Sequence, residues 1–330
     1  MILKNYLPPV ITNMTFEYLD DPEYCTSFNA AFYNIPEKIT NWKAAFIGAC
    51  TSGNLKLVEL AHQSADYLVH SRGVSSACKN NHIHVIKFIL AFEDLHFLKL
   101  NYGENMVLAC EHGHMELVRF FLTFMNGTDE HLKFYYNRGL ISASRNNHMH
   151  VAQLMLDMGG DSCNSVMFYA CMHNATKFIN TLVNHFVSMT SNNDNSSSAS
   201  QLDMDKFNSI ITSGLNGACA SGSINRVFEM IKLGATNFNK ALYFACYNNN
   251  MHICVLLSYL GVNNYNEGLE GACAKNHKEL VKLMIKLGAN NYGFALYSAC
   301  RNNSVESVQI LLDAGANNYN SGLQGACEYG

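Results

Sequence analysis

Apolar residues in the last third of the chain recur at the spacing of a helix, in one short run and then in a second. The stretch 267–293 shows the pattern clearly. Its first apolar run falls on one helical face and consists of Leu269, Ala272 and Cys273. This run predicts a short helix that ends near residues 275–276.

A second apolar stripe begins after His277 and predicts a second helix. It consists of Leu280, Val281, Met284, Ile285 and Leu287, and we expect Leu283 to belong to the core as well. Gly288 then stands where a left-handed residue ends a helix. Because helices of about 10 residues are marginal alone in water, each of these helices must pack against its neighbours.

The two-helix pattern repeats at a fixed interval that an Ala-Cys dipeptide marks. Its cysteines stand 27 positions apart, at Cys219, Cys246, Cys273, Cys300 and Cys327. A fixed period of about 20 to 50 residues is typical of a solenoid, in which each repeat buries its apolar face against the next. The sequence therefore predicts an all-α helical repeat solenoid, and places function on an extended surface.

Less regular repeats precede these and centre on Cys50, Cys78, Cys110, Ser144 and Cys171. A polar, low-complexity stretch, SNNDNSSSAS, then interrupts the array and is expected to form a mobile excursion. We predict an N-terminal helical cap, a first stack, a polar insertion and a second stack with a partial last repeat, at 1–43, 44–187, 188–207 and 208–330. One continuous stack with a long loop is an equal alternative.

The repeat resembles the ankyrin repeat. The segments Cys110-Glu-His-Gly-His-Met-Glu-Leu-Val and Lys282-Leu-Met-Ile-Lys-Leu-Gly-Ala-Asn match the ankyrin pattern best. The ankyrin unit has about 33 residues and opens with Thr-Pro-Leu-His, whereas this repeat is shorter and has Gly268-Leu269-Glu270 there. The missing residues fall where ankyrin repeats form a β-hairpin finger, so we expect that hairpin to be shortened or absent.

The short period and the Ala-Cys signature most resemble ankyrin repeats of giant DNA viruses of amoebae, of the mimivirus kind. The resemblance implies a scaffold without catalysis that binds a protein of unknown identity, from the host, through a concave surface of first helices. It also implies that the repeated histidines brace the loops between helices by hydrogen bonds.

A second period of two repeats lies over the first. Two positions before each cysteine, Gly217, Gly271 and Gly325 alternate with Phe244 and Ser298. Duplication of a repeat pair, with a bulky residue packed against a glycine of the neighbouring helix, would produce this alternation. Drift at a weakly constrained position is the alternative.

Composition narrows the function classes. Charged residues are only 15% of the chain, the net charge is -4, and no basic cluster suggests a nucleic-acid partner. No apolar run is long enough to span a membrane and no secretory segment is evident. Cysteines in a buried helical register behave as small apolar residues, which favours a reducing, intracellular location in the cytoplasm, that of the host if the protein is viral. The abundant asparagine is attributed to coding bias.

Candidate metal and catalytic sites are weak. His82, His84 and His277 lie near cysteines, but no Cys-x-x-Cys pair accompanies them, so we predict no zinc site. We find no phosphate loop or nucleophile elbow. Cys163 lies outside the repeat register and would need an unseen base to act as a nucleophile. We therefore expect no enzyme activity and no cofactor.

Partner-binding residues should differ from repeat to repeat on the exposed side of the first helix, because scaffold residues recur. Tyrosine and arginine are also common among interface hot spots. These criteria select Tyr243, Tyr247, Glu270, Lys275, Tyr297 and Arg301. Plain solvent-exposed surface is the alternative interpretation.

The two ends of the chain suggest two further partners. A Leu-Pro start followed by apolar residues resembles an F-box, which docks onto ubiquitin-ligase subunits; its contacts would be Leu7, Pro8, Phe16 and Leu19. The alternative is that this segment only caps the solenoid. At the other end the last repeat stops after one helix without a polar cap, so end-to-end self-association there is a further expectation.

Overall fold

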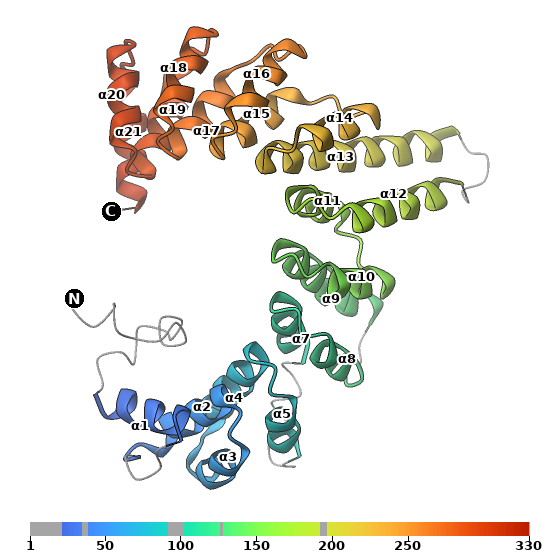
Figure 1. Cartoon of the computed structure of the whole chain (residues 1–330), viewed down its shortest axis with the longest axis vertical. Helices are drawn as coiled ribbons and strands as arrows, with labels where there is room; N and C mark the ends of the chain where they lie inside the picture. Colours follow the sequence, from blue (N-terminus) through green and yellow to red (C-terminus); the bar gives the residue numbers. More distant parts are fainter. Residues whose placement is uncertain (1–21, 35–38, 92–101, 126–127, 192–196, 330) are drawn as a thin grey trace. The chain divides into compact units, whose positions relative to one another are not determined.

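The computed structural model describes residues 22–34, 39–91, 102–125, 128–191 and 197–329 (Figure 1). The chain divides into two compact units, Met1–Asp161 and Ser162–Gly330. Within the described residues every regular element is a helix and no strand occurs. The prediction of an all-α helical repeat architecture is therefore confirmed.

The N-terminal unit consists of paired helices, of which the first members α2, α4, α7 and α9 pack side by side. α1 packs against α2, in the segment predicted to form a cap. The helices are α1 (Pro22–Phe32), α2 (Trp42–Ser52), α3 (Leu55–Ala61), α4 (Tyr67–Lys79), α5 (Ile83–Leu90), α7 (Tyr102–Glu111), α8 (Met115–Leu122), α9 (Asp129–Arg145) and α10 (Met149–Asp157), with a 3-10 turn η5 (His62–Ser64) after α3.

The C-terminal unit has two layers. The first helices α11, α13, α15, α17, α19 and α21 pack in sequence, and each following second helix packs against the first helix of its own repeat (Figure 1). The helices are α11 (Cys163–Met172), α12 (Thr176–Ser191), α13 (Ser197–Ser221), α14 (Ile224–Lys232), α15 (Phe238–Tyr247), α16 (Met251–Tyr259), α17 (Asn266–Ala274), α18 (Lys278–Lys286), α19 (Tyr292–Arg301), α20 (Val305–Asp313) and α21 (Tyr319–Tyr329).

The repeat built on α17 and α18 follows the sequence pattern closely. α17 ends at Ala274, His277 is the N-cap of α18, and Gly288 has the left-handed φ of 104° that ends α18. Leu280 and Met284 are fully buried. Leu283 is only partly buried, so its expected place in the core is wrong. It lies at the margin of the apolar stripe, where Met284 takes the inner position.

Most of the Ala-Cys cysteines lie in a buried seam between helices, as their register predicts, whereas Cys300 is partly buried and Cys327 is exposed. Seven of them have no exposed surface: Cys50, Cys78, Cys110, Cys171, Cys219, Cys246 and Cys273. Burial raises the pKa of the Cys171 and Cys273 thiols to about 12. These two side chains are therefore neutral apolar residues at physiological pH.

The third residue after each of these seven cysteines, and after Cys300 and Ser144, has a left-handed backbone. Glycine occupies it in three repeats and asparagine in the others, with φ between 56° and 77° throughout. Asparagine tolerates this conformation better than other residues with a side chain, because its amide hydrogen-bonds locally. Coding bias is therefore not the whole reason for the abundance of asparagine. The asparagines are Asn81, Asn147, Asn174, Asn249, Asn276 and Asn303.

An asparagine side chain ties consecutive turns together where ankyrin repeats would have a β-hairpin. The Asn266 Oδ1 atom accepts hydrogen bonds from the backbone N–H groups of Asn290 and Asn291, both at 2.8 Å. Asn239 Oδ1 accepts from Asn263 and Asn264 in the same way, at 3.4 and 3.3 Å. These bonds satisfy turn N–H groups that a strand partner would otherwise take.

The glycines of the two-repeat period lie against the backbone of the preceding first helix. A Cβ atom on Gly271 would be 2.5 Å from the Tyr243 carbonyl oxygen, and the approach is even closer for Gly217 and Gly325. The glycine therefore meets a carbonyl group, not the bulky side chain expected there. The Phe244 ring instead contacts the Phe168 ring at 5.0 Å, although their helices stand on either side of α13.

The polar segment differs from the expected excursion, since α12 continues to Ser191 and α13 begins at Ser197. The later part of α13 carries a buried apolar stripe that includes Ile211 and Leu215, and a helix held by packing extends readily into polar sequence. The predicted F-box contacts Leu7, Pro8, Phe16 and Leu19 lie outside the described residues.

Candidate protein-binding face

The six residues predicted to bind a partner lie on three neighbouring first helices. Tyr243 and Tyr247 belong to α15, Glu270 to α17 with Lys275 as its C-cap, and Tyr297 and Arg301 to α19. We name the exposed side of α15, α17, α19 and α21 the first-helix face. All six residues contribute to this face. They form two groups, one around Tyr243 and one around Tyr297, and the Glu270 carboxylate lies between the groups.

The first group is a stack of rings and cations. The rings of Tyr243 and Tyr247 are stacked with centroids 5.8 Å apart. The Lys275 Nζ atom lies 4.9 Å from the centre of the Tyr247 ring, and Lys240 Nζ lies 5.1 Å from that of Tyr243. Such cation–π contacts contribute about 0.5–1 kcal/mol each at exposed sites. They hold both rings in place before any partner arrives.

The second group surrounds Tyr297. Its hydroxyl donates a hydrogen bond to the Glu328 carboxylate on α21, and the Arg301 guanidinium lies 5.9 Å from its ring centre. The hydrogen bond to Glu328 is the main reason why the pKa of Tyr297 is raised. This ring is therefore fixed by a bond to the next helix and by a cation on its own helix.

Glu270 lies between the two groups and is half-buried. Burial is the main reason why the pKa of its carboxyl group is raised, while Lys240 nearby has the opposite effect. Ser298 Oγ donates a long hydrogen bond of 3.4 Å to its Oε1 atom. Among the described residues no ion pair is formed by this carboxylate.

A hollow of about 410 Å³ opens beside Glu270 and Tyr297. Its remaining lining comes from the turns and from α19 and α21: Asn291, Gly293, Phe294, Asn318, Ser321 and Gln324. Phe294 is 66% exposed, which is unusual for a phenylalanine and leaves one wall apolar and open. The sequence reading missed these residues, although Phe294 varies between repeats just as the selected positions do.

Rings and hydrogen-bond acceptors alternate along the first helices of the C-terminal unit. Three positions before each cysteine stand, in order, Phe168, Asn216, Tyr243, Glu270, Tyr297 and Gln324. The glycine after each acceptor lies against the carbonyl group of the preceding ring residue. Because the glycine lets the two helices approach closely, each acceptor lies beside a ring of the preceding helix. The pattern of ring and acceptor therefore has a period of two repeats.

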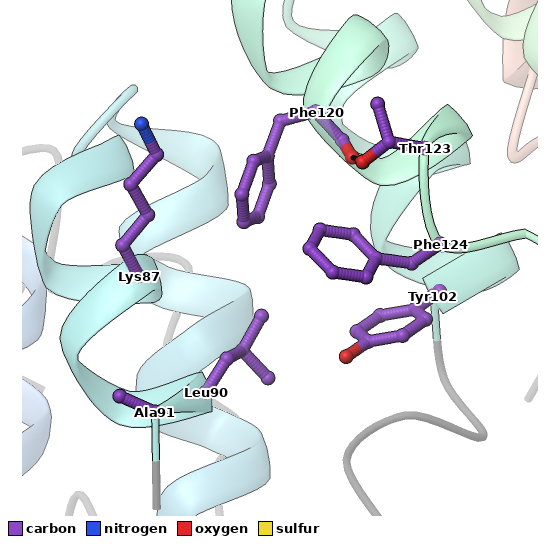
Figure 2. Close-up of a pocket in the computed structure, with 7 residues that line it drawn as sticks. All are labelled: Lys87, Leu90, Ala91, Tyr102, Phe120, Thr123 and Phe124. Carbon is purple, nitrogen blue, oxygen red and sulfur yellow. Dashed lines mark hydrogen bonds between the residues drawn. The ribbon is translucent and has the colours of Figure 1, made fainter.

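A second hollow, of about 590 Å³, lies in the N-terminal unit between α5 and the pair α7–α8 (Figure 2). The rings of Tyr102, Phe120 and Phe124 line one side, and Leu90 and Lys87 of α5 line the other. It is mostly apolar and contains none of the predicted partner-binding residues.

The loop histidines bond to the backbone of the preceding repeat. The Nε2 atoms of His82, His114 and His277 lie 3.1, 2.9 and 3.1 Å from the carbonyl oxygens of Thr51, Lys79 and Tyr247. The bracing role that the resemblance implied is therefore present. In the described part of the chain no three potential ligands cluster as a metal site would require, and no helix there is long and apolar enough to cross a membrane.

Residues 242–321 match the family model for ankyrin repeats, in three copies. This stretch consists of ankyrin repeats. The ankyrin match contains the entire first-helix face except the beginning of α15 and most of α21. It confirms the resemblance for the regular repeats, which contain the segment that begins at Lys282, while the segment that begins at Cys110 lies outside the match.

Among solved structures, the chain is similar to the human ASB11 ankyrin repeat domain, with 19% sequence identity. The similarity covers 64% of this chain and 84% of that one, with a TM-score of 0.29. No curated protein matches the chain.

Proposed function

We propose that this protein binds a partner protein through the first-helix face of its ankyrin repeats and carries out no chemical step. Tyr243, Tyr247 and Tyr297 present large ring surfaces whose positions are already fixed by neighbouring charged groups. Rigid aromatic side chains lose little entropy on binding, and they dominate the affinity of many interfaces. This prearranged set of rings is the observation that carries the proposal.

A weakly hydrogen-bonded acceptor on the same face, the Glu270 carboxylate, supports it. Among the described residues the Glu270 carboxylate forms no ion pair and accepts one long hydrogen bond, from Ser298 Oγ at 3.4 Å. Polar groups left in this state gain most from a partner that supplies donors. A partner whose own contacts recur every two repeats would meet one ring and one hydrogen-bond acceptor in each pair of repeats.

Site-specific photocrosslinking tests the proposal. A benzoylphenylalanine placed at Tyr243 or Tyr297 should crosslink a defined protein in a cell lysate, and an amoeba lysate is the first choice, given the resemblance to repeats of amoeba viruses. The control position is Tyr259 on α16, which is 85% exposed but belongs to a second helix. Equal crosslinking from Tyr259, or none from the first-helix face, would contradict the proposal.

A second candidate is a substrate receptor for a ubiquitin ligase, which rests on the Leu7-Pro8 start and its following apolar residues. In that case the repeats would select the target while the N-terminal segment contacts the ligase. Capture of ligase subunits that is lost when Leu7 and Pro8 are changed to alanine would support it. Capture that persists in that variant, or no ligase subunit at all, would exclude it.

A further inference from the structure

The hollow beside Glu270 lies where glycine replaces one asparagine of the turn ladder. Asn239 and Asn266 each extend a side chain to the next turn. In the following repeat the corresponding residue is Gly293, and the position its Cβ would take is 2.8 Å from Asn318 Nδ2. The turn of Asn318 therefore receives no ladder side chain, and the Asn318 side chain itself lies against Gly293.

The walls of this hollow combine an aromatic face with amide oxygens. Phe294 supplies an exposed ring, and Tyr297 a second ring whose neighbour is Arg301. Asn291, Asn318 and Gln324 add side-chain amides that can accept hydrogen bonds. A planar cation can stack on such a ring while its edge donates to the surrounding oxygens.

Of the lining residues, only Glu270 carries a charge at neutral pH. Its carboxylate is half-buried, and Glu267 nearby adds to the negative potential there. Lys240 is the neighbouring cation, but its Nζ atom lies over the Tyr243 and Phe244 rings, at 5.1 and 5.9 Å from their centres. A half-buried carboxylate without an ion pair is stabilised most by a cation that arrives with hydrogen-bond donors.

We propose that this hollow binds an arginine side chain of the partner protein, with the guanidinium group between the Glu270 carboxylate and the Phe294 ring. The inference rests on the proposed function and specifies one contact of that partner. A guanidinium group suits the site better than an ammonium group, because its five donors lie in one plane and can reach the carboxylate and the amide oxygens together.

The test uses the full chain with 4-fluorophenylalanine in place of Phe294 and follows its fluorine NMR signal. The probe is N-acetyl-arginine methylamide, and the matched probes are the corresponding citrulline and lysine compounds. Citrulline has nearly the shape of arginine without its charge. We expect a saturable shift with the arginine probe, and binding weaker by about tenfold with citrulline, as a charged hydrogen-bonded pair implies.

Two variants locate the binding. Glu270→Gln should weaken binding of the arginine probe by about tenfold, whereas Glu279→Gln, at an exposed position on α18, should leave it unchanged. Binding that persists in Glu270→Gln, an equal response to citrulline, or no saturable shift up to about 50 mM would overturn the proposal. Equal or tighter binding of the lysine probe would overturn the assignment to arginine.

These outcomes are separate from those of the crosslinking experiment. Crosslinks at Tyr243 and Tyr297 without arginine binding would leave the face as a protein-binding surface and remove only this contact. Arginine binding without any crosslink would support the arginine site but contradict the proposal that the first-helix face binds a protein.

Discussion

Gly271 lies so close to the Tyr243 carbonyl oxygen that a Cβ atom would be only 2.5 Å away. Folded proteins do not show Cβ atoms at such distances, and the obstacle here is backbone, which cannot turn aside as a side chain can. The glycine therefore sets how closely α15 and α17 approach. Because Tyr243 and Glu270 stand on those two helices, it also sets the distance between a ring and an acceptor of the first-helix face.

Gly271→Ala should accordingly lower the free energy of unfolding by about 1–3 kcal/mol, as overpacked substitutions do. In an unobstructed helix the same change would be favourable by about 1 kcal/mol, since alanine has the higher helix propensity. The sign of the change in the free energy of unfolding therefore shows whether the Cβ position of Gly271 is obstructed. Urea unfolding measures it, with Glu270→Ala on the same helix as the control; equal stability of both variants would contradict the close approach.

Leu280→Ala should lower the free energy of unfolding by about 2–5 kcal/mol, because it leaves a cavity at a fully buried position. Leu283→Ala should have a clearly smaller effect, since Leu283 is only partly buried. The pair is well matched: both are leucines of α18, one turn apart. Urea unfolding of the two variants would contradict the assigned orientation of α18 if Leu283→Ala were the more damaging.

Acid should destabilise the N-terminal unit. Burial lowers the pKa of His82 below its usual value, with a smaller effect from His84 and His114, and burial also lowers the pKa of His148. A folded pKa below the unfolded value of about 6.5 means that the unfolded chain binds more protons. The stabilisation is complete above that pH and is lost as the pH falls through the folded pKa.

His82→Asn should reduce this loss of stability between pH 7 and pH 5. Asn250 occupies the corresponding position in another repeat, where its Nδ2 atom donates to two carbonyl oxygens at 2.8 and 2.9 Å. Asparagine can therefore retain the bracing bond without titrating. Thermal unfolding at the two pH values measures the change, with His252→Asn in the C-terminal unit as the control. An unaltered pH dependence in His82→Asn would show that this imidazole is not responsible.

The features that the sequence predicts well are those that each repeat determines alone. The apolar stripe of α18, its N-cap His277 and its left-handed Gly288 follow from local spacing and from backbone preference. The selected rings and charges also lie on the first-helix face, because exposed positions of one helix are exposed in the next.

The features it does not predict depend on how side chains of neighbouring repeats meet. Nothing in the spacing indicates that Lys275 lies over Tyr247, or that Asn266 binds the next turn. The hollow at Glu270 is lined by residues more than 20 positions away, Gly293 among them. Arg226 is a further case: it is buried where other repeats have Ile253 or Leu280, and its guanidinium donates to Asn174 of the preceding repeat at 2.9 Å.

The turn ladder itself should stabilise the ankyrin repeats measurably. Asn266→Ala removes the acceptor of two backbone N–H groups and should lower the free energy of unfolding by about 1–2 kcal/mol. Asn266→Asp keeps an oxygen in place and should retain most of the stability. Differential scanning calorimetry of the two variants would contradict the ladder if aspartate were as damaging as alanine.

Restoring the missing ladder residue should have the opposite effect. Gly293→Asn would give the turn of Asn318 the side chain that Asn239 and Asn266 provide in earlier repeats, and the nearest obstacle is the movable end of the Asn318 side chain. Replacing a helical glycine also reduces the entropy of the unfolded chain, which is worth about 0.4–1 kcal/mol. We expect a higher thermal midpoint than in Gly293→Ala, since both variants share the entropic gain and only asparagine adds the hydrogen bonds. Equal midpoints would show that the ladder bond does not form at this turn.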